Sequence, residues 1–206
     1  PKATITPYDI GTMMRQSLYY TLRPSKWISG LNVRATKEIF RQAFSPQNTI
    51  KWFETIKKDP LYKPMIRAGI EFTDPVGMKL SAKEEVFATN IPKRLQNLPG
   101  IGIYFKGLMA SERAFTAPLN HIRFEEGKRL FNLLIKKGYD PKVDIGVFKK
   151  TANFINTTTG RGNLGALNKV TAELNTLLWS PRLFKANIDM LNPVFYWRLP
   201  KGRRLQ

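Results

Sequence analysis

One helical pattern constrains the fold more than any other feature of this sequence, because it runs without a break from Ile101 to Lys137. Its apolar residues recur at the three- and four-residue spacing of a single helix face. Pro118 lies inside the pattern and has no amide hydrogen, so it predicts a kink or a join between two helices. Gly138 follows as a C-cap. The predicted core face consists of Phe115, Leu119, Ile122, Leu130 and either Leu133 or Leu134.

Shorter helical patterns lie on both sides of this one, and prolines mark where they begin or end. Arg23-Pro24 ends the first pattern, because the residue before a proline avoids the α region. Ser45-Pro46 and Asp140-Pro141 each predict an N-cap followed by the first helical residue. The predicted helices cover residues 8–22, 31–44, 46–58, 61–68, 101–137, 141–154, 166–179 and 180–191.

No segment alternates as a β-strand does, so the predicted fold class is all-α. We expect an irregular multi-helix domain with a kinked long central helix and extended basic terminal arms. Three regions are predicted: a basic N-terminal helix or arm over residues 1–30, a helical core domain over residues 31–191, and a basic aromatic C-terminal arm over residues 192–206. The sequence begins at Pro1 without an initiator methionine, and we expect it to be a region of a longer polypeptide.

A glycine-rich basic loop, Thr159-Gly160-Arg161-Gly162-Asn163-Leu164-Gly165, separates two of the predicted helices. Glycine permits positive φ and a close backbone approach, so Gly160, Gly162 and Gly165 predict a tight turn around Arg161. A cradle for a phosphate is one interpretation. However, the loop lacks the Lys-Ser/Thr spacing of a P-loop and follows a helix rather than a strand.

The favoured interpretation is a structural corner between helices. The preceding threonines suit this interpretation, since threonine is a poor residue for a helix interior and a ready backbone cap. The arginines predicted to lock the corner against Glu112 or nearby carbonyls are Arg113, Arg123 and Arg161.

The charge balance is strongly basic: 34 Lys and Arg against 15 Asp and Glu give a net charge of +19. Such an excess predicts a polyanionic neighbour, namely nucleic acid, an acidic protein surface or an anionic membrane. No apolar run approaches the roughly 20 residues that a membrane span needs. The absence of cysteine excludes disulfides and thiolate metal sites.

The two ends of the chain are its most basic parts, and they also carry aromatic residues that could stack on bases. The competing interpretation is that these aromatics belong to the core or to a subunit contact, and that the cations are solvated. The candidate nucleic-acid or partner-binding residues are Arg15, Arg23, Lys26, Trp27, Arg182, Lys185, Tyr196, Trp197, Arg198, Lys201, Arg203 and Arg204.

No residue set predicts catalysis. His121 is the single histidine and is expected to be structural or exposed. A weaker hypothesis combines it with Glu112 and Arg161 in an enzyme. No catalytic residue, metal site or cofactor is predicted, and the expected class is not an enzyme.

Several short motifs, taken in order, resemble a helical domain associated with the large polyvalent proteins of bacteriophages and prophages. They include Ser81-Ala82-Lys83-Glu84-Glu85, Leu98-Pro99-Gly100-Ile101-Gly102, Ala110-Ser111-Glu112-Arg113-Ala114, Thr159-Gly160-Arg161-Gly162 and Ser180-Pro181-Arg182. The resemblance covers most of residues 9–191.

This resemblance implies a non-enzymatic structural module of an internal virion or DNA-ejection protein. The implied location is the capsid interior, the portal or the tail lumen, followed by delivery into the host cell. The implied partners are portal, tail and other internal virion proteins together with packaged DNA, and the implied assembly contains several symmetric copies. The alternative is a nucleic-acid-binding or antirestriction factor delivered with the genome.

Overall fold

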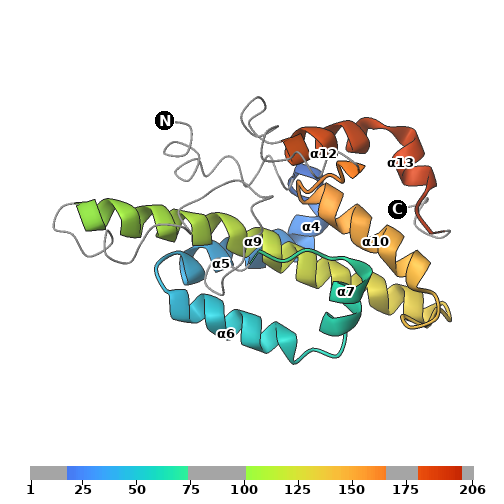
Figure 1. Ribbon diagram of the computed structural model, residues 1–206, viewed down its shortest axis with the longest axis horizontal. Coiled ribbons are helices and arrows are strands. Elements are labelled where there is room, and N and C mark those ends of the chain that lie inside the picture. Colours follow the sequence, from blue (N-terminus) through green and yellow to red (C-terminus); the bar gives the residue numbers. More distant parts are fainter. Residues whose placement is uncertain (1–17, 74–100, 166–180, 201–206) are drawn as a thin grey trace.

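The structure, a computed structural model, describes residues 18–73, 101–165 and 181–200 (Figure 1). All regular secondary structure in these ranges is helical, which confirms the predicted all-α class. The predicted helix over residues 166–179 and most of the predicted helix over residues 8–22 lie outside the described residues. The described helices are α3 (Leu18–Thr21), α4 (Pro24–Ile28), α5 (Leu31–Ala43), α6 (Pro46–Lys57), α7 (Tyr62–Ala68), α9 (Ile101–Lys136), α10 (Ile145–Thr158), α12 (Pro181–Leu191) and α13 (Pro193–Trp197).

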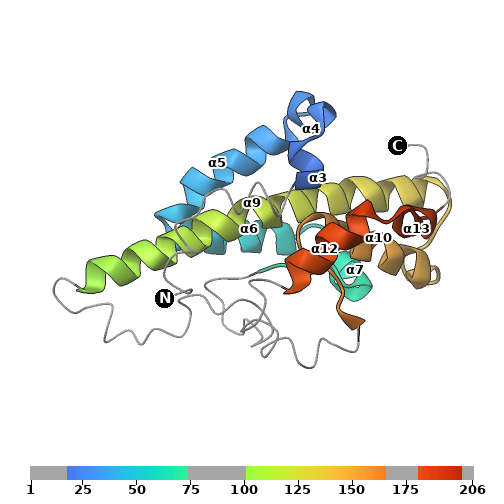
Figure 2. The same ribbon diagram turned by 90° about the horizontal axis from the view of Figure 1, so that it is seen from above.

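The central element is α9, a helix of 36 residues that continues through Pro118. It is only slightly bent, so the proline neither ends the helix nor joins two helices (Figure 2). Pro118 lies in a stretch, residues 116–124, in which every residue is buried. Packing on all sides therefore holds the helix together where the proline removes one backbone hydrogen bond.

Helix α9 is covered from more than one direction, since α5 packs along it and α6 and α10 also contact it. Leu119, Ile122 and Leu130 of the predicted core face are buried, but Phe124 and Phe131 are buried as well. A helix enclosed in this way has no single apolar stripe, and spacing alone therefore underestimates its buried surface.

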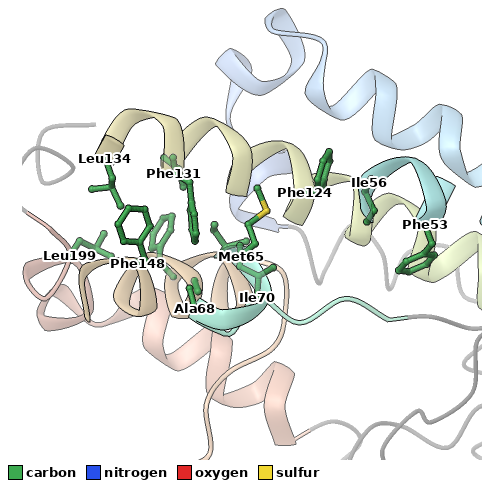
Figure 3. Packing of buried hydrophobic residues seen from close by; sticks show 14 of the residues in the cluster. Phe53, Ile56, Met65, Ala68, Ile70, Phe124, Phe131, Leu134, Phe148 and Leu199 are labelled. Carbon is green, nitrogen blue, oxygen red and sulfur yellow. The ribbon is translucent and has the colours of Figure 1, made fainter. Parts of the chain in front are cut away.

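The largest apolar cluster joins α9 to α6, α7 and α10 (Figure 3). Phe131 of α9 meets Phe148 of α10 with ring centroids 4.9 Å apart and rings inclined by 64°. Edge contacts of this kind add to the free energy gained from burial. A second, smaller cluster fixes α3 and α5 to α9 through Tyr20, Leu31, Ala35 and Ile122.

Helix α10 begins later than predicted, at Ile145 rather than Pro141. The side chain of Asp140 accepts a hydrogen bond from the backbone N–H of Lys142 at 2.7 Å. Asp144 in turn accepts one from the backbone N–H of Asp140 at 2.8 Å. These two bonds form a turn, so Asp140 acts as a turn residue and the prediction that it caps α10 is wrong. At Ser45 the predicted cap is present, accepting the N–H of Asn48 at 3.3 Å.

The described parts of both predicted arms, residues 18–30 and 192–200, fold onto the body. Tyr20 is fully buried, and its hydroxyl shares a 3.1 Å hydrogen bond with Thr158. Asn192 caps α13, and Phe195 of α13 stacks on Phe154 of α10 at 5.9 Å. Tyr20 and Phe195 therefore anchor these segments, in line with the competing interpretation that the terminal aromatics belong to the core. Residues 1–17 and 201–206 lie outside the described ranges.

Candidate functional site

The glycine-rich loop after α10 makes a tight corner that packs against α12, and the predicted helix over residues 166–179 that would follow it lies outside the described residues. Gly160 and Gly165 have positive φ angles of 82° and 58°, which glycine adopts without strain. Gly162 is required for a different reason, because a Cβ there would lie 2.5 Å from the backbone nitrogen of Ala186 in α12. Its N–H donates to the carbonyl of Arg182 at 3.0 Å. The corner thus brings two backbones into direct contact.

Arg123 supports the corner from inside the fold and is only 1% exposed. Its Nε donates to the hydroxyl of Thr159 at 2.8 Å, and its Nη2 donates to the carbonyl of Thr159 at 3.0 Å. Its Nη1 reaches Oδ1 of Asn120 at 3.4 Å. A guanidinium offers several donors in a fixed plane. Arg123 therefore bonds both to Thr159, the C-cap residue of α10, and to Asn120 on its own helix, α9.

Two further arginines attach the corner to the segment Gly69–Thr73. Arg161 donates to the carbonyl of Glu71 at 2.9 Å and also to the hydroxyl of Thr73. Arg182 reaches both carboxylate oxygens of Glu71, at 3.1 and 2.9 Å, and the carbonyl of Gly162 at 3.3 Å. The two guanidiniums share one acidic residue, and together they join α12, the corner and the segment 69–73.

Two asparagines complete the attachment of the segment 69–73. The side-chain amide of each bonds to one backbone N–H and one backbone carbonyl of the segment, as a neighbouring backbone would. Asn156 of α10 donates to the carbonyl of Gly69 at 2.7 Å and accepts the N–H of Glu71 at 3.1 Å. Asn120 of α9 makes the same pair of bonds with the N–H and carbonyl of Thr73. Asn120 and Asn156 are among the motif residues of the resemblance, but the sequence assigns them no role, because an asparagine within a helix gives no signal of a distant backbone partner.

Arg113 does not lie at the corner. It donates to the carbonyls of Gln42 and Ala43, at 3.1 Å and at 2.7–3.1 Å respectively, at the end of α5. The last carbonyls of a helix have no partner within the helix, and a cation is favourable there. The predicted role of Arg113 is therefore corrected to capping α5 on α9. The side chain of Glu112 lies outside what the structure describes.

The predicted binding residues near the amino end are largely engaged within the fold. Arg23 stacks over the ring of Tyr19 at 4.0 Å, and Lys26 pairs with Glu126 at 2.6 Å. Trp27 is 43% exposed, with its indole N–H bonded to the carbonyl of Thr21. Arg15 lies outside the described residues.

Toward the carboxyl end, Arg182 belongs to the corner, and Lys185 pairs with Asp189 on the same helix. The hydroxyl of Tyr196 donates to the carbonyl of Met190 at 2.8 Å. Trp197, at 66%, and Arg198 are exposed. Lys201, Arg203 and Arg204 lie outside the described residues.

Glu126 and its two cationic partners predict a pH-dependent contribution to stability. Burial raises the pKa of Glu126, but hydrogen bonds from Arg129 and Lys26 outweigh burial and hold this pKa below its ordinary value of 4.5. The ionised carboxylate therefore stabilises the fold above pH 4.5, and this contribution is lost as pH falls through the lowered pKa. Urea denaturation at stepwise lower pH measures this loss. The free energy of unfolding should fall less in Glu126→Gln than in the parent chain.

Glu54 on the exposed side of α6 provides the matched control for that measurement. Glu54→Gln removes the same charge without touching the Lys26 and Arg129 contacts. If Glu126→Gln and Glu54→Gln show equal falls, the assigned role of Glu126 is wrong.

His121 lies on α9 and is 9% exposed. Neither of its ring nitrogens has a hydrogen-bond partner within the described ranges. Burial lowers the pKa of His121, and the nearby carboxylates of Glu125 and Glu38 offset part of this effect. Arg161, which the catalytic hypothesis groups with it, is instead bonded to the segment 69–73.

Unpaired basic charge gathers at a place that sequence analysis did not single out, the turn between α9 and α10. Five exposed lysines lie at the end of α9, in this turn and in the first part of α10, and none forms an ion pair with the residues that the structure describes. We call this group the lysine end; it consists of Lys136, Lys137, Lys142, Lys149 and Lys150. The signal was present in the sequence as five lysines within fifteen positions. The larger excess of basic residues at the two termini obscures this signal.

Within the described ranges, no group of three or more histidine or acidic side chains is placed to hold a metal ion. Comparison of the sequence with protein-family models gives no match, and comparisons with curated proteins and with solved structures give none either.

Proposed function

We propose that this chain is a non-enzymatic helical module of a bacteriophage internal virion or DNA-ejection protein, and that it contacts DNA through the lysine end. The observation that carries the DNA contact is the set of exposed lysines at the end of α9, in the following turn and in the first part of α10. Lysines without ion-pair partners can neutralise phosphates and release their counterions. Asp140 and Asp144 lie in the same turn, so the five positive charges of the lysine end stand against two negative charges.

The virion setting rests on the ordered motifs that resemble the phage-associated domain. In this setting the chain packs against portal, tail or other internal virion proteins, in several symmetric copies. The buried corner supports a structural role, because its arginines are occupied in joining α10, α12 and the segment 69–73. Locating the chain in an intact particle tests this part of the proposal.

The DNA contact predicts a steep dependence on salt. The affinity of the 206-residue chain for duplex DNA, measured by fluorescence anisotropy, should fall strongly between about 50 and 200 mM salt. Changing Lys137, Lys149 and Lys150 to glutamine should weaken binding and reduce the logarithmic salt slope by about 0.9 for each phosphate that is no longer neutralised.

A charge-matched control uses three exposed lysines of α6, the following turn and α7: Lys51, Lys58 and Lys63. Changing these to glutamine alters the net charge by the same amount and should leave most of the affinity. Equal losses in the two triple variants would mean that DNA responds to net charge alone. That result would remove the lysine end as a distinct contact.

A further inference from the structure

The outer face of α5 carries apolar side chains that contribute little to the packing of the described fold. Val33, Phe40 and Phe44, the last being the C-cap residue, follow one another at helical spacing and are 49%, 72% and 82% exposed. Leu31 and Ala35 on the opposite face are buried against the second apolar cluster. The helix is thus apolar on two opposite faces, of which only one is buried by the fold.

Positive charge accompanies this outer face. Arg34, Lys37 and Arg41 are exposed on α5. The single acid in α4 and α5 is Glu38, which is 7% exposed and accepts hydrogen bonds from Gln42 and Arg41. The outer face therefore combines exposed phenylalanines with cations and presents no exposed carboxylate of its own.

The preceding helix adds aliphatic surface. Ile28 of α4 is 87% exposed, and Leu22, just before α4, is 70% exposed. In Figure 2, α4 and α5 stand out together on one side of α9, whereas α12 lies toward the other side. Together α4 and α5 form a projecting ridge. Such a ridge can dock on a flat apolar surface that has no groove of matching shape.

The charges discriminate among possible occupants of this ridge. A second copy of the chain would bring cations of like sign together, which is unfavourable. Duplex DNA would pair with the cations but would leave Phe40, Phe44 and Ile28 against phosphates and sugars. An anionic bilayer satisfies both features, because apolar side chains enter the acyl boundary while arginine and lysine meet the headgroups.

We propose that the ridge formed by α4 and the outer face of α5 docks on an anionic lipid surface, with Phe40 and Phe44 inserted at the interface. This contact is peripheral: no helix in the described parts of the chain combines the length and the apolar character needed to cross a bilayer. The inference does not depend on the DNA contact, since the lysine end belongs to α9, α10 and the turn between them.

Vesicle sedimentation tests the proposal with the 206-residue chain. Vesicles of phosphatidylglycerol and phosphatidylcholine should bind it, and vesicles of phosphatidylcholine alone should bind it far more weakly. Phe40→Ser with Phe44→Ser should weaken binding to the anionic vesicles at least about tenfold, because two exposed rings no longer leave water. Circular dichroism checks that the double variant remains folded.

A matched control is available on α12, where Phe184 and Ile188 are 58% and 47% exposed. Phe184→Ser with Ile188→Ser removes a smaller but still substantial exposed apolar surface and should leave vesicle binding unchanged. Depth is measured directly with tryptophan in place of Phe40 or of Phe184. Brominated lipid should quench the fluorescence added at position 40 and not that added at position 184.

Three outcomes would overturn the proposal. Absence of binding to anionic vesicles removes the lipid surface as a partner. If Phe40→Ser with Phe44→Ser leaves binding to anionic vesicles unaltered, the chain adsorbs by charge alone. If the changes at Phe40 and Phe44 instead weaken binding to single-stranded DNA, with no vesicle binding, the ridge is a base-stacking surface. Duplex affinity should be equal in the parent chain and the double variant, which separates this test from that of the lysine end.

Discussion

Gly162→Ala is expected to lower the free energy of unfolding by about 3 kcal/mol, at the upper end of the usual cost of overpacking. The added methyl would lie 2.5 Å from the nitrogen of Ala186 and 2.6 Å from the carbonyl oxygen of Arg182. Both are backbone atoms of α12, so no side-chain rotation relieves the clash. The helix must move away, which also breaks the bond from the N–H of Gly162 to Arg182. Urea denaturation followed by circular dichroism measures the loss.

The comparison for this variant is Gly146→Ala in the first turn of α10. A Cβ at Gly146 meets nothing within 4 Å, and alanine is a better helix former than glycine by about 1 kcal/mol. Gly146→Ala should therefore be as stable as the parent chain or slightly more stable. If Gly162→Ala unfolds at the same urea concentration as Gly146→Ala, the close contact between the corner and α12 does not stabilise the protein.

Arg123→Met is the second change with a large expected effect, a loss of about 3 kcal/mol in the free energy of unfolding. Methionine fills part of the space but donates no hydrogen bond. The carbonyl of Thr159 would lose its bond from Arg123 and remain buried, since Thr159 is fully buried. An unsatisfied buried polar group costs more than the bond itself contributes. Thermal and urea unfolding both report the change.

Two companion variants make this prediction specific. Arg67→Met changes an exposed arginine on α7 and should alter the free energy of unfolding by no more than about 0.5 kcal/mol. Arg123→Lys retains the charge but cannot reach the hydroxyl and the carbonyl of Thr159 in one plane, so it should rescue only part of the loss. Full stability of Arg123→Lys would show that charge alone, and not the planar set of donors, supports the corner.

Local signals in the sequence predicted most of the described helices, but not the five-residue helices α4 and α13, because Pro24 and Pro193 were interpreted as the ends of the preceding helices and each instead begins a new one. Helical spacing and proline positions indicated the all-α class, the long helix and the starts of α6 and α12. The three glycines at positions 160, 162 and 165 predicted a tight turn, because positive φ and close backbone approach both favour glycine. Pro118 was a poor predictor of a kink or join, because burial on all sides keeps α9 continuous through a residue that usually disrupts a helix.

Partners distant in sequence were harder to predict. Arg113 and Arg123 are ten residues apart on one helix, yet they cap different elements, α5 and the end of α10. Lys26 looked available for a partner, but the fold places it 2.6 Å from Glu126. In each case the local pattern identifies a cation, and only the three-dimensional packing determines whether its charge is occupied or free.

The corner has a consequence for the order in which the chain folds. Glu71 and Arg182 are 111 positions apart, whereas contacts within α5 or α10 span only a few residues. Distant contacts require closure of long loops and form slowly compared with local ones. We therefore expect the contact between the segment 69–73 and Arg182 to form late in folding. On this expectation, docking of α12 is the step that completes the junction of α10, α12 and the segment 69–73.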